Sequence, residues 1–134
     1  MCFVINFSRY WHERNELMLF VCYPKCTTCQ KAQKYLETLG ISFTVRDIKT
    51  DKPSEKELRE WYEKSGLVLK RFFNTSGLLY KSLHLKDKLP GMPEEEQFQL
   101  LASDGMLVKR PILVAEDFVL VGFKEKEWAA VFSK

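Results

Sequence analysis

The residues in this chain best suited to chemistry are two cysteines, Cys26 and Cys29, which lie three positions apart. The thiolate, rather than the thiol, is the form of cysteine that attacks disulfides. Cys26 lies between an apolar run and a helical pattern, so we expect it at the first turn of a helix, where free N–H groups and the helix dipole favour negative charge. Cys29 is close enough to form a disulfide with Cys26 once that sulfur is oxidised. The spacing therefore predicts redox chemistry, with Cys26 attacking and Cys29 resolving.

Zinc binding is the main alternative, because Cys2, His12, Cys22, Cys26 and Cys29 all fall within the first thirty positions. A structural zinc site usually takes ligand pairs from two separate elements, and no second Cys/His pair follows in the sequence. Cys22 lies inside an expected strand, where a cysteine behaves as a small buried apolar residue. Four cysteines in 134 residues are also sparse for a secreted, disulfide-stapled fold. We therefore expect a redox pair and no bound metal.

A strand, a helix and a second strand are expected to position the cysteines. Residues 18–23 are apolar and β-prone, and Pro24 ends the run. Residues 30–39 carry apolar side chains at helical spacing, and Gly40 stops that helix. Residues 41–46 alternate apolar and polar side chains, as a half-buried strand does. The pattern predicts a β-α-β unit.

The remaining sequence predicts a helical insertion followed by two strands and a closing helix, hence an α/β protein. Ser54 and Glu57 form a capping box at the start of the insertion, and the last two strands have hairpin spacing. The expected elements are a helix from 53–57 to about Gly66, a helical run at 67–73, a lysine-rich stretch and turn before Pro93, a helix at 94–103, strands at 111–115 and 118–121, and a helix at 124–132.

Length and composition indicate one cytoplasmic domain over residues 18–134. The chain is 46% hydrophobic and 29% charged, which is typical of globular proteins. A net charge of +3 without a basic block argues against direct nucleic-acid binding, and the apolar runs are too short to span a membrane. Residues 1–17 have no signal-peptide pattern, so we expect a poorly ordered N-terminal extension.

Several motifs together resemble the glutaredoxin-type arsenate reductase and Spx-like family. They are Tyr23-Pro-Lys-Cys-Thr-Thr-Cys29, Lys109-Arg-Pro-Ile112 and Val121-Gly-Phe123, and the segments 69–77 and 101–109 are similar to the short, largely uncharacterised members. The resemblance covers Met18 to the C-terminus. It implies a thioredoxin-like fold with an inserted helical region and a catalytic cysteine at Cys26.

The resemblance also implies the rest of the site. Arg110 is expected beside the thiolate, where its permanent charge lowers the cysteine pKa. Pro111 is expected to follow a cis peptide bond that faces the cysteine. Substrate contacts are expected from Lys25, Thr27, Thr28 and Pro111. No cofactor is expected to be bound, and glutathione, glutaredoxin or thioredoxin would donate electrons.

Three functions follow, in order of preference. The first is a thiol–disulfide oxidoreductase acting on small thiol or protein disulfides. The second is an Spx-like redox regulator that binds RNA polymerase, although the sequence ends at Lys134 without the basic C-terminal stretch of those regulators. The third is a true arsenate reductase. Only Arg110 matches one of the family's arginines. Asn74 and Phe123 lie near the positions at which the family carries its other arginines. Lys70, Arg71 and Lys124 are the nearby cations. We therefore expect weak arsenate reduction.

Overall fold

A four-stranded sheet forms the centre of the computed structural model, which describes residues 18–133. The strands are β1 (Leu19–Cys22), β2 (Thr44–Asp47), β3 (Ile112–Val114) and β4 (Val119–Val121), in the order β2-β1-β3-β4. β1 and β2 are parallel, whereas β3 is antiparallel to both β1 and β4. With α2 (Thr27–Thr38) between β1 and β2 and α7 (Glu125–Phe132) after β4, this is the predicted thioredoxin-like fold. The extension expected at residues 1–17 lies outside the described residues, and none of the described helices is long and apolar enough to cross a bilayer.

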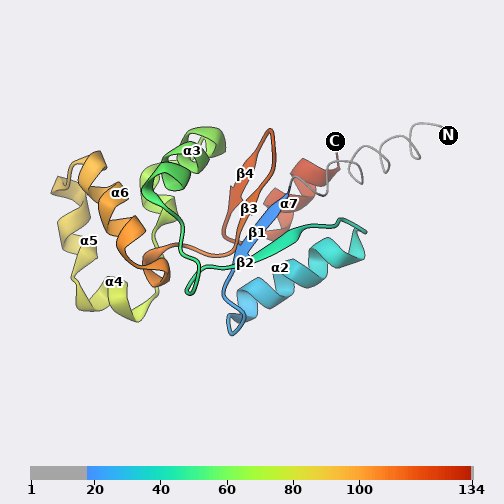
Figure 1. Cartoon of the computed structure of the whole chain (residues 1–134), viewed down its shortest axis with the longest axis horizontal. Coiled ribbons are helices and arrows are strands. Elements are labelled where there is room, and N and C mark those ends of the chain that lie inside the picture. Colours follow the sequence, from blue (N-terminus) through green and yellow to red (C-terminus); the bar gives the residue numbers. More distant parts are fainter. Residues whose placement is uncertain (1–17, 134) are drawn as a thin grey trace.

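Both faces of the sheet are covered, because side chains on each strand alternate between two cores. In β1, Phe20 and Cys22 pack with α2 and α7, while Val21 points into the other core with the insertion. Trp128 and Phe132 of α7 are buried, as predicted. Figure 1 shows the insertion on the left of the sheet, α2 below β2, and α7 to the right of β3 and β4.

The insertion between β2 and β3 is almost entirely helical. It consists of α3 (Glu55–Ser65), η2 (Leu69–Phe72), α4 (Leu78–Ser82), α5 (Leu85–Lys88), η3 (Leu89–Gly91), α6 (Glu94–Ser103) and η4 (Gly105–Leu107). The sequence predicted a lysine-rich stretch and a turn before Pro93, with no helix there, whereas α4, α5 and η3 occupy this part of the insertion. Each of these helices is at most five residues long, too short for helical periodicity to be recognised. Tyr80, Leu85 and Leu89 hold them to the core.

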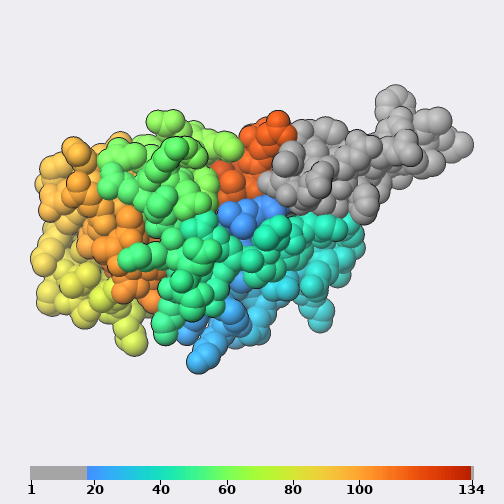
Figure 2. All heavy atoms as spheres, viewed as in Figure 1, coloured from blue at the N-terminus to red at the C-terminus, as the bar shows by residue number. Residues whose placement is uncertain are grey.

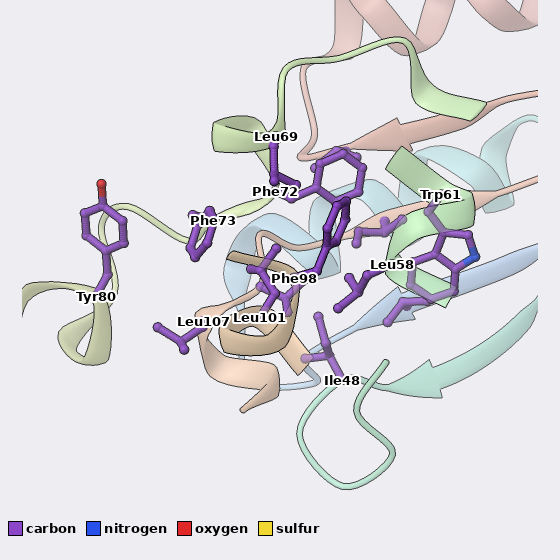
Figure 3. Packing of buried hydrophobic residues seen from close by; sticks show 14 of the residues in the cluster. Ile48, Leu58, Trp61, Leu69, Phe72, Phe73, Tyr80, Phe98, Leu101 and Leu107 are labelled. Carbon is purple, nitrogen blue, oxygen red and sulfur yellow. The ribbon is translucent and has the colours of Figure 1, made fainter. Parts of the chain in front are cut away.

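Aromatic side chains of the insertion lie in one core with Val21 of β1 and Ile112 of β3. Phe72 of η2 and Phe98 of α6 are both buried and both lie edge-on to Tyr62 of α3, with ring centroids 6.2 and 5.5 Å away. Figure 3 shows Phe72 and Phe98 beside Leu58 and Ile48, and in Figure 2 the green atoms of α3 lie against the orange atoms of α6. Burial of side chains of this size is worth about 1.5–3 kcal/mol each. The insertion and the sheet therefore share one core.

The active-site helix begins earlier than the sequence pattern indicated. α2 starts at Thr27 rather than Gln30, and Cys26 is its N-cap with extended backbone angles (φ −86°, ψ 122°). The buried side chains of the helix begin with Cys29 and Ala32. Thr27 and Thr28 are polar and exposed, so the apolar pattern in the sequence did not include them. The helix ends before Gly40, as predicted. The early start places Cys26 itself at the positive end of the helix.

An ion pair ties β2 to the first turn of α3. Arg46 donates two hydrogen bonds to the Glu57 carboxylate, Nη1 to Oε2 at 2.6 Å and Nη2 to Oε1 at 2.9 Å. The predicted capping box is confirmed, since the Ser54 hydroxyl accepts from the Glu57 N–H and Glu57 Oε1 accepts from the Ser54 N–H. Glu57 thus serves two elements at once. Its hydrogen bonds to Arg46 outweigh partial burial and lower its pKa from 4.5 to about 2.

The pKa of Glu57 predicts an acid-sensitive contribution to stability. Because the folded pKa is below the ordinary value, the stabilisation is complete above about pH 4.5 and is lost as the pH falls towards 2. We expect Glu57→Gln to lower the free energy of unfolding by about 1 kcal/mol at pH 7, where a partly exposed pair and a cap are both weakened. Urea denaturation at pH 7 and pH 3 measures this, with the exposed Glu63→Gln on the same helix as control. A deficit for Glu57→Gln that is equal at both pH values would contradict the assignment.

Candidate active site

Cys26 is held at the junction of β1 and α2 by its own backbone. Its N–H donates to the Tyr23 carbonyl at 2.9 Å, and its carbonyl accepts the first helical hydrogen bond from Gln30 at 3.0 Å. The side chain is partly buried, and the sulfur is a free thiol. The helix start therefore fixes the sulfur next to the N–H groups that open α2.

Four donors make Cys26 more acidic than an ordinary thiol. Partial burial alone would raise the pKa of Cys26, but hydrogen bonds to its sulfur outweigh that effect and lower the pKa below its usual 9.0. The donors are the N–H and thiol of Cys29, the guanidinium of Arg110 and the N–H of Thr28. Donors that favour the charged form are one of the established causes of reactive thiolates. The geometry thus agrees with the role expected for Cys26.

Cys29 has the opposite character. Its side chain is only 2% exposed, and burial raises the pKa of its thiol to about 12. The Tyr23 N–H donates to Cys29 Sγ at 3.4 Å, which holds the sulfur below the reactive surface. A protonated, buried thiol cannot attack first. The pair is therefore asymmetric: a partly exposed cysteine with a lowered pKa is in contact with a buried cysteine with a raised pKa.

Arg110 reaches the sulfur of Cys26 from the segment before β3. The bond between Arg110 and Pro111 is cis, as predicted, and Pro111 is buried. The guanidinium lies over the ring of Tyr23, with Cζ 5.2 Å from the ring centroid. Two of its nitrogens, Nε and Nη1, are buried and have no hydrogen-bond partner among the described residues. Buried donors of this kind are normally satisfied, so they leave capacity for an anionic ligand.

A cleft of about 620 Å³ opens beside Cys26 between the sheet and the insertion. Five basic side chains line it: Lys70, Arg71, Lys109, Arg110 and Lys124. None of the described residues in its wall is acidic. The cleft combines a nucleophilic sulfur with a strongly positive lining.

The other expected substrate residues are not all in the cleft. Thr28 lines it together with Cys26, whereas Lys25 and Thr27 are exposed at the turn and lie outside its wall. Pro111 lies beneath the surface, where its carbonyl accepts from the Gly122 N–H at 2.8 Å. A direct substrate contact by Lys25, Thr27 or Pro111 stays a prediction.

The sequence analysis gave no role to Tyr23 or Lys109. Tyr23 supports Arg110 with its ring and Cys29 with its N–H, and the position of Tyr23 directly after the strand was the available signal. Lys109 lies across Gly122, where an added Cβ would come within 3.1 Å of Lys109 Cε. Gly122 also has a positive φ of 73°, which favours glycine. Both roles depend on contacts between segments far apart in the chain.

The zinc alternative places two of its ligands, Cys2 and His12, outside the described residues. Cys22 is 3% exposed, as predicted, and burial together with the charge of Asp47 raises the pKa of its thiol. Among residues 18–133, no group of three or more His, Cys, Asp or Glu side chains is arranged to hold a metal ion.

Comparison with known proteins places these residues in a family context. Residues 22–131 match the ArsC family. The uncharacterised protein YusI of Bacillus subtilis is 53% identical over 111 residues, which are 83% of this chain and 94% of YusI. The crystal structure of an ArsC-family-related protein from Bacteroides fragilis is 54% identical, with a TM-score of 0.85 over 87% of this chain and 98% of that one. Global transcriptional regulator Spx 1 of Oceanobacillus iheyensis is 29% identical over 104 residues, 78% of either chain.

The contact between Arg110 and Cys26 predicts the reactivity of the thiol. Because the Arg110 guanidinium lowers the pKa of Cys26, Arg110→Gln should leave less thiolate at pH 7 and slow alkylation by iodoacetamide about tenfold, a typical effect of losing one neighbouring opposite charge. The alkylation rate against pH, followed by mass spectrometry, measures this. Lys88→Gln, which removes an exposed cation of α5, is the matched control. Equal rates for both variants and the unchanged protein would show that Arg110 does not act on the thiolate.

Proposed function

Because the chain belongs to the ArsC family, we propose that it is a thiol–disulfide oxidoreductase in which Cys26 attacks and Cys29 resolves. One observation carries the proposal: a partly exposed cysteine with a lowered pKa lies in contact with a buried cysteine whose pKa is raised to about 12. This difference decides which sulfur reacts first with a substrate. The substrates of the proposed oxidoreductase are the disulfides of small thiols or of proteins.

The reaction has two sulfur exchanges. The Cys26 thiolate attacks one sulfur of the substrate disulfide, the S–S bond breaks, and the other half leaves as a thiolate. Cys29 then attacks Cys26 Sγ in the mixed disulfide, and its proton goes to the departing substrate thiolate. The two exchanges reduce the substrate disulfide by two electrons to two thiols, and they leave the protein with a Cys26–Cys29 disulfide. Glutathione, glutaredoxin or thioredoxin is the reductant that restores the dithiol.

Arg110 and Thr28 hold the charge on Cys26 before it attacks and again when the reductant opens the Cys26–Cys29 disulfide. The same donors stabilise the sulfur when it is the leaving group, because Cys26 again becomes a thiolate when the reductant opens the disulfide. Lys25 and Thr27, exposed beside Cys26, contact the body of a substrate.

Trapping the mixed disulfide tests the division of roles. We expect Cys29→Ser to accumulate a stable mixed disulfide on Cys26 and Cys26→Ser to react with no disulfide, since the buried Cys29 thiol, with a pKa of about 12, does not attack a free substrate first. In the unchanged protein, mild oxidation should link Cys26 to Cys29. Peptide mass spectrometry measures all three results, with Cys22→Ala as the control that should behave as wild type. A bond between Cys26 and Cys22 would overturn the two-cysteine mechanism.

An Spx-like regulator is the second candidate. The observation in its favour is the match to Spx 1, which spans 78% of that regulator. In this role the Cys26–Cys29 pair is a switch, and the partner is RNA polymerase. A pull-down of RNA polymerase with reduced and oxidised protein, beside turnover of hydroxyethyl disulfide, separates the two functions. Redox-dependent binding without turnover would favour the regulator.

Arsenate reduction is the third candidate, and the basic cleft favours it. We nevertheless expect weak turnover of arsenate with glutathione and glutaredoxin, because a tetrahedral dianion needs several converging donors and Arg110 is the only clear match to the family's arginines. Arg110→Ala should still slow thiolate chemistry. A steady-state assay of arsenate reduction measures the first point. Efficient reduction that is lost in Lys70→Gln or Arg71→Gln would contradict this expectation.

A further inference from the structure

The cleft beside Cys26 is larger than one disulfide bond or one oxyanion requires. Its volume of about 620 Å³ falls in the range of about 300–1,000 Å³ that is typical of sites for small organic ligands. A tetrahedral oxyanion held by Arg110 would leave most of this space unfilled. Thr75, Ser76 and the half-buried Phe123 also line it, and Val68 at its wall is 68% exposed. The wall therefore offers hydroxyl and apolar contacts for an organic body as well as charge.

Charge in the cleft is concentrated far beyond the average of the chain. The whole sequence carries a net charge of +3, yet five cations and none of the described acids line this one cleft. They come from η2, from the segment before β3 and from the segment before α7. Converging like charges repel one another and focus a positive potential on the space between them. An anionic ligand relieves that repulsion.

Protein acids neutralise these cations only weakly. Glu127 approaches Arg71 at 3.8 Å and Lys124 at 3.9 Å, and the side chains in both pairs are 39–69% exposed. Long, exposed pairs of this kind contribute little. Lys109 is held over Gly122, where no side chain competes with it for the space. The positive charge is therefore available to a ligand.

We propose that this cleft selects low-molecular-weight disulfides that carry several carboxylates or phosphates, and that Lys70, Arg71, Lys109 and Lys124 bind those groups. This rests on the proposed oxidoreductase function and adds its substrate class. One half of the anionic disulfide is transferred to Cys26 and the other leaves as a thiolate. Cys29 then releases the first half and supplies the proton, and a dithiol reductant restores Cys26 and Cys29. A cleft of this size fits a small molecule.

Single-turnover kinetics with disulfides of different charge test the selection. The reduced full-length protein is mixed with glutathione disulfide (carboxylates), coenzyme A disulfide (phosphates), hydroxyethyl disulfide (uncharged) and cystamine (cationic), and the formation of the Cys26–Cys29 bond is followed. We expect Lys70→Gln combined with Lys124→Gln to slow the anionic disulfides about tenfold, the uncharged one less than twofold, and cystamine not at all. The two anionic reagents distinguish carboxylate from phosphate recognition. Lys56→Gln, an exposed cation of α3, is the matched control and should change none of these rates.

Binding without chemistry separates this proposal from the function on which it rests. S-methylglutathione and S-methyl coenzyme A cannot exchange disulfides, so protection of Cys26 from the uncharged reagent iodoacetamide reports occupancy of the cleft. We expect at least one of them to protect the unchanged protein, less so at high salt or in the double lysine variant. Protection without disulfide turnover would overturn the oxidoreductase but keep the anion site. Three results would overturn the anion site. The first is that neither analogue protects Cys26, and the second is that the double lysine variant slows all four disulfides equally. The third is that the reaction rate depends on Lys70 and Lys124 only when the substrate is an acidic disulfide-linked peptide.

Discussion

The site depends on keeping a negative charge on a sulfur that is partly removed from water. Burial works against that charge, so the fold must bring enough donors to the Cys26 sulfur to reverse the effect. The N–H groups of Thr28 and Cys29 come from the helix start, and the guanidinium of Arg110 comes from a segment more than eighty positions later. The β1–β3 pairing brings these two parts of the chain together. The thioredoxin-like sheet is thus the means by which a helix start and a distant arginine meet at one atom.

The helical insertion has a direct part in placing Arg110. The end of η2 pairs with the segment before β3, where the Lys109 N–H donates to the Phe72 carbonyl, the Asn74 N–H donates to the Leu107 carbonyl, and Phe73 bridges Val108. The aromatic core anchors η2 through Phe72, which is fully buried. The insertion is therefore more than a cover for one sheet face. It fixes the segment that carries Arg110, and it supplies Lys70 and Arg71 to the same cleft.

The parts of this site that local chemistry determines could be read from the sequence. The Cys26–Cys29 spacing, the Ser54–Glu57 capping box and the alternation in the strands each depend on neighbours within a few residues. The start of α2 was missed because Thr27 and Thr28 are exposed and polar, and α4 and α5 were missed because single turns have no period. Four of the five cations in the basic cleft were named from the family resemblance: Arg110 beside the thiolate, and Lys70, Arg71 and Lys124 near the other arginine positions. Lys109 and the cleft itself were missed, because only tertiary packing unites the three segments that supply the cations.

Stabilisation of the Cys26 thiolate sets a limit on what the pair can do. Each donor that lowers the pKa of Cys26 stabilises the reduced protein, and a more stable reduced form makes the Cys26–Cys29 disulfide a stronger oxidant. The same contacts that speed attack on a substrate therefore weaken the drive to reduce it. A positively charged cleft offsets the weaker drive to reduce a substrate, because it binds an anionic substrate and raises the rate of encounter. This effect leaves the thiol chemistry unchanged.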